Sequence, residues 1–222
     1  MTANNIILYH YYVEPRIRAG LERNTLWEDE LHLQKLVEQC SSSVVSIEEE
    51  NRRVYGSGFF VSQYGHVVTT TSFPAYKKIL TVRYLDNIHE ARVIVYDAKN
   101  KIALLKIEVE NTPKITLAKY KSLKSGTISI ALGNPAGNGT VMEPGVIKKN
   151  YSPASTALFI ETTSMINNGN NGGPLIDTRG KVIGINLLVF HPQRNPTNTF
   201  FVIPVEQIIE SLSPVIDINE YI

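Results

Sequence analysis

The residues with the clearest chemical potential lie in the stretch INNGNNGGPLID, residues 166–177. Gly169, Gly172 and Gly173 tolerate backbone conformations that other residues avoid, so the stretch is typical of a tight loop. Such a loop can direct backbone N–H groups toward an anion or a carbonyl oxygen. Asn171 is a neutral carboxamide whose nitrogen lone pair is delocalised, so its side chain is not a practical nucleophile. The alternative is that the glycines serve the turn alone.

Other residue types that carry chemistry are few and scattered. Cys40 is the only cysteine, which excludes an intrachain disulfide and a cysteine-based metal site. We expect no metal and no cofactor, because the five histidines lack the spacing of metal ligands; they are His10, His32, His66, His89 and His191.

Charge and hydropathy exclude several classes of function. The formal net charge is +1 and the lysines are scattered, so there is no electrostatic case for nucleic acid. No run of about 18 apolar residues occurs, which predicts no membrane insertion. The N-terminus lacks the basic start and apolar core of a signal peptide. An intracellular location, cytosolic or organellar, is therefore expected, unless a leader has been removed.

The elements that must position the loop are mainly short strands. From Val44 to Val205, β-branched and aromatic runs alternate with Gly, Pro, Asn and Asp, which predicts an all-β barrel or sandwich. A capping box at Thr25 and Glu28 predicts a helix over residues 26–39. The segment PVEQIIESL predicts a short closing helix, and residues 1–24 form an arm without a sustained period.

Three blocks occur in order along the chain: VYGSGFFVSQYGHVVTTTSF, YDAKNKIALLKIE and FIETTSMINNGNNGGPLIDTRGKVIGIN. They resemble the segments that carry the catalytic histidine, aspartate and serine of the HtrA/Deg family of trypsin-like serine proteases. The resemblance implies two packed six-stranded β-barrels, roughly residues 41–120 and 127–205, in a domain of residues 25–212. Residues 213–222 would form a tail, and the PDZ domain common in the family is not expected.

Under this resemblance the catalytic histidine falls on Ser72, the aspartate on Lys101 and the serine on Asn171. Triad catalysis needs a hydroxyl to attack, an imidazole to accept its proton and a carboxylate to orient the imidazole. None of these groups stands at its position, and the members of a triad act as one unit. The sequence therefore predicts that the chain is not an enzyme but a degenerate, catalytically inactive pseudoprotease.

Two alternatives retain a reaction. Ser72 and Lys101 would be neighbours and could form a rebuilt serine hydrolase, although Ser72 would lie across the cleft from the oxyanion donors. His66 lies six residues before Ser72, but the resemblance places it on a turn that points away from the cleft.

The resemblance also implies a retained ligand site. The N–H groups of Gly169 and Asn171 would be the remnant of an oxyanion hole. Phe200, where the family has a small residue, would narrow a side-chain pocket. The strand expected to bind peptide carries Val182, Ile183, Gly184, Ile185 and Asn186.

Binding to other proteins is the function that remains. We expect a structural or regulatory subunit of a larger assembly or a homo-oligomer, with the aromatic and arginine-rich arm of residues 1–24 as its contact. The alternatives are an arm folded over its own barrel and a module that binds peptides in the retained cleft.

Overall fold

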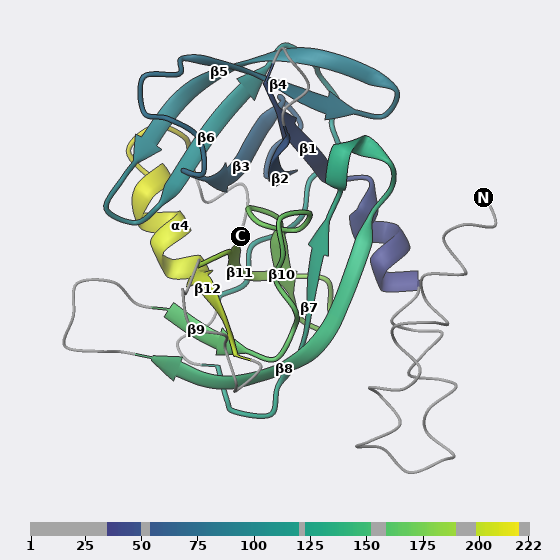
Figure 1. The fold of residues 1–222 in the computed structure, drawn as a ribbon, viewed down its shortest axis with the longest axis vertical. Helices are drawn as coiled ribbons and strands as arrows, with labels where there is room; N and C mark the ends of the chain where they lie inside the picture. Colours follow the sequence, from purple (N-terminus) through teal and green to yellow (C-terminus); the bar gives the residue numbers. More distant parts are fainter. Residues whose placement is uncertain (1–34, 50–53, 120–122, 152–158, 190–198, 218–222) are drawn as a thin grey trace.

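The computed structural model describes residues 35–49, 54–119, 123–151, 159–189 and 199–217. Within these ranges the strands form two closed, six-stranded antiparallel barrels, one above the other in Figure 1. The predicted all-β, double-barrel fold class is thereby confirmed. The predicted arm lies outside the described residues.

The first barrel closes in the strand order β1-β2-β3-β6-β5-β4. Its interior is filled by alternate side chains of these strands, including Val45, Phe60 and Leu105, all fully buried. The strands are β1 (Val44–Glu48), β2 (Val54–Phe60), β3 (His66–Thr70), β4 (Ile79–Tyr84), β5 (Asn87–Asp97) and β6 (Ile102–Ile107).

The second barrel closes in the order β10-β11-β12-β9-β8-β7. Between β7 and β8, a short 3-10 turn η1 (Pro135–Gly137) packs against β1, β2 and β4 of the first barrel. The strands are β7 (Ile128–Gly133), β8 (Val141–Tyr151), β9 (Phe159–Thr162), β10 (Pro174–Ile176), β11 (Val182–Leu187) and β12 (Phe200–Pro204).

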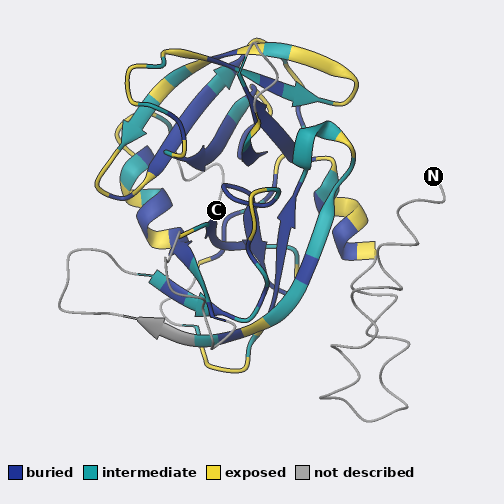
Figure 2. Cartoon of the chain, viewed as in Figure 1, coloured by how far each residue is buried: buried dark blue, intermediate teal, exposed yellow. Residues whose placement is uncertain are grey.

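A separate apolar layer holds the barrels together. Phe59 and Leu104 of the first barrel, and Leu132 and Ile185 of the second, contribute to one cluster between the barrels. Figure 2 shows that the strands facing this layer are buried. Burial on both faces explains why β6 and β11 read as nearly continuous apolar runs rather than as alternating strands.

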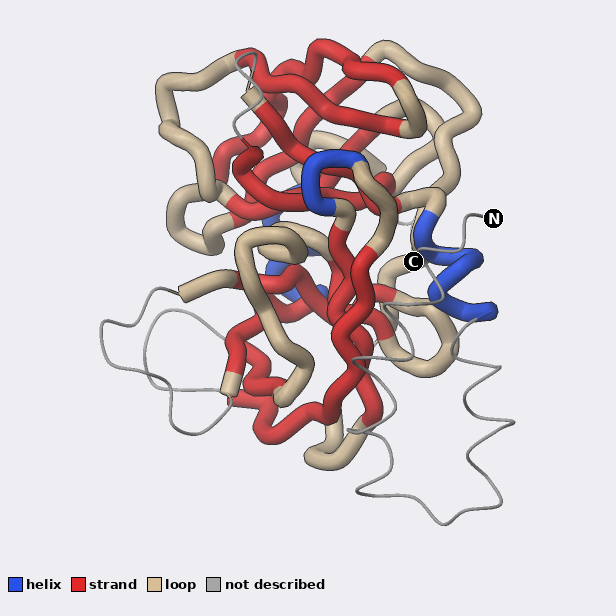
Figure 3. The backbone as a smooth tube through the Cα atoms, turned by 45° about the vertical axis from the view of Figure 1, so that its right-hand side comes forward, coloured by secondary structure: helices blue, strands red, loops and turns tan. Residues whose placement is uncertain are grey.

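Two helices flank the barrels (Figure 3). The predicted closing helix is confirmed as α4 (Val205–Leu212), and Ser211 Oγ donates to Asp97 Oδ2 at 2.7 Å, which joins α4 to β5. Residues 35–41 are also helical, whereas residues 26–34 of the predicted first helix lie outside the described ranges. No helix in the described part of the chain is both long enough and apolar enough to span a bilayer.

Candidate functional site

The loop of residues 167–173 lies where β2 of the first barrel meets the second barrel. We name this contact between β2 and the loop the seam. Ser57 fastens the loop to β2: its N–H donates to Asn171 O at 2.7 Å and its Oγ donates to Gly169 O at 2.7 Å. The same Oγ accepts the N–H of Asn134 at 2.8 Å. Ser57 is fully buried, so one residue of the first barrel organises two segments of the second.

Two glycines permit this close approach. A Cβ atom on Gly56, whose φ is +144°, would lie 2.4 Å from Asn171 O. A Cβ atom on Gly172, whose φ is +82°, would lie 2.4 Å from both Ser57 O and Thr69 Oγ1. The glycine at position 172 therefore serves the fit between the barrels as well as the turn.

Asn167 engages both N–H groups expected of an oxyanion-hole remnant. Its Oδ1 accepts the N–H of Gly169 at 2.7 Å, and its carbonyl oxygen accepts the N–H of Asn171 at 3.0 Å. Sequence reasoning missed Asn167. An asparagine two residues before a glycine in a turn is the signal that could have revealed it, because its side chain commonly bonds the backbone two residues on.

The carboxamide of Asn171 points to the end of β11. Its Oδ1 accepts the N–H of Leu188 at 2.9 Å, and the residue is 7% exposed. Among the described residues its Nδ2 has no hydrogen-bond partner. Asn171 thus links the loop to the chain segment that follows the strand.

Ser72 and Lys101 are neighbours through the backbone. The N–H of Thr71, the residue before Ser72, donates to Lys101 O at 3.1 Å. The side chains of Ser72 and Lys101 are both exposed. Ser72 Oγ donates to Tyr55 O at 3.3 Å, and in the described structure no hydrogen bond joins it to Lys101. Asp97, at the end of β5, accepts hydrogen bonds from Asn100 and Ser211.

The residues of the expected peptide-binding strand are all in β11 and all buried. This strand is hydrogen-bonded on both edges: it pairs with β10 as far as Ile185 and with β12 as far as Leu187. An added peptide strand can therefore pair only beyond Leu187. Phe200 is partly buried and packs, together with Leu188, against the apolar interior of the second barrel.

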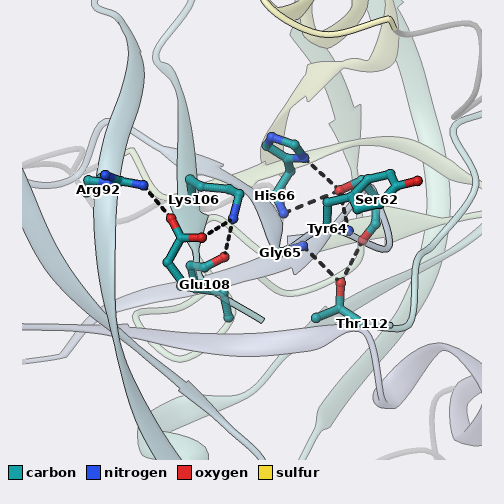
Figure 4. A network of polar contacts seen from close by, with 9 residues as sticks. Ser62, Tyr64, Gly65, His66, Arg92, Lys106, Glu108 and Thr112 are labelled. Atoms are coloured by element: carbon teal, nitrogen blue, oxygen red, sulfur yellow. Dashed lines mark hydrogen bonds and ion pairs between the residues drawn. The ribbon is translucent and has the colours of Figure 1, made fainter. Parts of the chain in front are cut away.

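His66 lies at the start of β3 and belongs to a different network (Figure 4). Ser62 Oγ accepts the N–H groups of Tyr64 at 3.1 Å and of His66 at 3.4 Å, and it lies 2.7 Å from His66 Nδ1. Because the two backbone N–H groups occupy the lone pairs of Oγ, the Ser62 hydroxyl is free to donate to Nδ1 of a neutral imidazole. Burial, and then the neighbouring Lys106, lower the pKa of His66 below 6.5.

This arrangement predicts a loss of stability in mild acid. A histidine whose pKa is depressed in the folded state contributes stability above its unfolded pKa of about 6.5, and this contribution falls as the pH drops through that value toward the folded pKa. His66→Asn keeps an acceptor for Ser62 but does not titrate. Urea unfolding at about pH 7.5 and about pH 5.5 should therefore show a smaller acid-induced loss in His66→Asn than in the wild type. Equal losses in the two proteins would contradict the assignment.

A metal site finds no support in the described part of the chain, where no cluster of three or more His, Cys, Asp or Glu side chains occurs. The described histidines are His66 and His89, and neither lies at the seam. The chemistry at the seam consists of a carboxamide, backbone carbonyls and N–H groups, and the Ser72 hydroxyl contacts β2 at Tyr55.

Comparison with known proteins places this architecture in a family. The model of the trypsin-like peptidase domain matches residues 56–185, more than half of the chain. The chain belongs to the trypsin-like peptidase family. That match includes most of β2, the seam loop and most of β11.

Individual relatives of this trypsin-like domain confirm the resemblance to the HtrA/Deg family. A probable periplasmic serine endoprotease, DegP-like, from Ectopseudomonas mendocina is 36% identical over 155 residues, which cover 68% of this chain and 33% of the relative. One from Hahella chejuensis is 32% identical over 171 residues, 73% of this chain and 35% of the relative. The crystal structure of the serine endoprotease from Yersinia pestis matches with a TM-score of 0.70 at 27% identity, covering 83% of this chain and 66% of that one. The chain thus spans about a third of the length of these curated relatives.

The comparisons contradict the prediction that this trypsin-like chain is not an enzyme. Its relatives are described as serine endoproteases, so the relationship points to a protease. The prediction rests on three side chains, those of Ser72, Lys101 and Asn171. The relationship rests on the framework of both barrels and on the loop at their seam.

The predicted intracellular location is also wrong by this comparison, because the relatives are described as periplasmic. That prediction uses the charge and hydropathy of the first residues in this sequence. Those residues carry no information about what precedes them in a longer chain.

Proposed function

We propose that this trypsin-like domain binds polypeptides in extended form at the seam, and that its partners are other proteins. The relatives are endoproteases, whose ligands are polypeptides, and this supports the class of ligand. An assembly or homo-oligomer built through residues 1–24, and an exported location like that of the periplasmic relatives, belong to the same proposal.

The observation that carries the proposal is the backbone that follows β11. Alternate residues of a strand direct their N–H and C=O groups to the same side. On the β10 side, Asn186 exchanges hydrogen bonds with Gly172 and Gly173, and the next residue on that side is Leu188. The N–H of Leu188 donates to the side chain of Asn171 and not to the backbone of another strand. An extended segment can therefore add its own backbone at this point.

Apolar side chains flank the same position. Leu188 and Phe200 cover the interior cluster of the second barrel, which includes the buried Ile166. Val189, the next residue, is 45% exposed. Backbone pairing at Leu188 would place the side chains of an added segment along this apolar surface, which adds affinity to the hydrogen bonds.

Binding is tested with fluorescein-labelled β-casein, which has no stable fold, by fluorescence anisotropy. Val189→Asp places a charge beside the proposed pairing position and should weaken binding about tenfold, because burial of one valine is worth about 1.5 kcal/mol. Val215→Asp is the matched control, since Val215 is 48% exposed and follows α4, and it should bind like the wild type.

The same mixtures are analysed by mass spectrometry for new casein termini, because the relatives are endoproteases. Absence of casein binding, or equal weakening in the Val189 and Val215 variants, would overturn the proposal. New termini that depend on Val189 would add hydrolysis at the seam to the binding function.

A further inference from the structure

We propose that the Asn171 carboxamide is a built-in occupant of the pairing position at Leu188, and that an extended polypeptide binds by displacing it. The inference rests on the proposed binding function, which it deepens: it names the group that competes with the ligand. The domain would then carry its own competitor for the strand position that its partners use.

Three successive hydrogen bonds along β11 and the residue that follows it carry this inference. On the β10 side, the N–H of Gly172 donates to Asn186 O at 2.8 Å, and the N–H of Asn186 donates to Gly173 O at 2.9 Å. The next N–H in the series, that of Leu188, donates to Asn171 Oδ1 at 2.9 Å. A carboxamide has the same C=O acceptor as a peptide group, so the Asn171 side chain acts as a one-residue substitute for a paired strand.

The side chain can leave without disturbing the loop. The backbone of Asn171 is held separately, by its N–H to Asn167 O and by its carbonyl oxygen to the N–H of Ser57. In the described residues its Nδ2 has no hydrogen-bond partner, so the bond to Leu188 is the one hydrogen bond of the carboxamide there. Rotation about the side-chain bonds therefore exchanges one neutral hydrogen bond for another.

The competition predicts a defined effect on affinity. Removal of one neutral intramolecular hydrogen bond that competes with the ligand should tighten binding by about two- to tenfold. Asn171→Ala removes the competitor and should bind labelled β-casein tighter by this factor. Asn171→Asp keeps the shape and offers a charged acceptor, whose bond to the Leu188 N–H is stronger than a neutral one, so it should bind no tighter than the wild type.

A second measurement follows the hydrogen bond itself. In the free protein, exchange of the Leu188 amide hydrogen, measured by NMR, should be slow in the wild type and in Asn171→Asp and faster in Asn171→Ala. In the unmodified protein, the side-chain NH₂ resonance of Asn171 should shift when casein is added. This readout does not depend on whether any variant folds.

The outcomes separate the two proposals. If the wild type binds casein but Asn171→Ala binds no tighter, the built-in competitor is excluded and the binding function stands. An Asn171 NH₂ resonance that casein leaves unchanged would also exclude the competitor. If no form of the protein binds casein, the proposed function fails, and the competitor fails with it.

Discussion

Replacing Gly172 with alanine is expected to lower the free energy of unfolding by about 2 to 5 kcal/mol, the combined cost of a left-handed backbone and an overpacked contact. The φ of Gly172 is +82°, and an added Cβ would lie 2.4 Å from atoms of Ser57 and Thr69. One of these is the backbone oxygen of Ser57, which cannot move without moving β2. The substitution should therefore push the two barrels apart at the seam.

Gly126→Ala separates the two causes of this loss. Gly126 has a similar φ of +85°, but an added Cβ would have no atom within 4 Å. This variant should lose only the backbone contribution, about 1 to 2 kcal/mol. Urea unfolding of both variants checks the prediction, and equal losses would show that the contact with the first barrel does not matter.

Arg83→Ala is expected to lower the free energy of unfolding by about 3 kcal/mol, the lower end of the range observed when one partner of a buried ion pair is removed. Arg83 donates to both carboxylate oxygens of Glu48 at 2.9 Å. The Glu48 side chain is only 3% exposed, whereas that of Arg83 is 22% exposed. Loss of the arginine would thus leave a buried carboxylate without its counterion. It would also remove the side chain that packs on Gly137 of η1.

Arg92→Ala is the matched control for this pair. Arg92 binds Glu108, but both side chains are mainly exposed, so water can replace the lost contact. Its unfolding curve should overlay that of the wild type. If Arg83→Ala unfolds at the same urea concentration as Arg92→Ala, the Glu48–Arg83 pair does not stabilise the fold.

Local patterns were sufficient to predict an all-β chain, and the resemblance to a family supplied the two barrels. Strand propensity and turn residues are properties of neighbouring positions, and the runs between Val44 and Val205 became the strands of two closed barrels. The helix over Val205–Leu212 was visible for the same reason. The order of the three family-like blocks was enough to identify the trypsin-like family.

The site was less predictable because its contacts join distant parts of the chain. Ser57 reaches Gly169 across 112 sequence positions, and no periodicity signals that pairing. The engagement of Gly169 and Asn171 by Asn167, and the double pairing of β11, likewise depend on the folded loop. The prediction of a non-enzyme was wrong because three side-chain identities were given more weight than the architecture that the chain shares with its relatives.

The bonds of Ser57 also have a consequence for the order of folding. Contacts of high sequence separation form late and slowly, because the entropy of closing a long loop is lost before the contact is gained. The two anchors of the seam loop, at Gly169 and Asn171, both depend on β2 of the other barrel. The loop can therefore take its final shape only after both barrels have folded and docked. During synthesis, the seam would be the last part of the chain to mature.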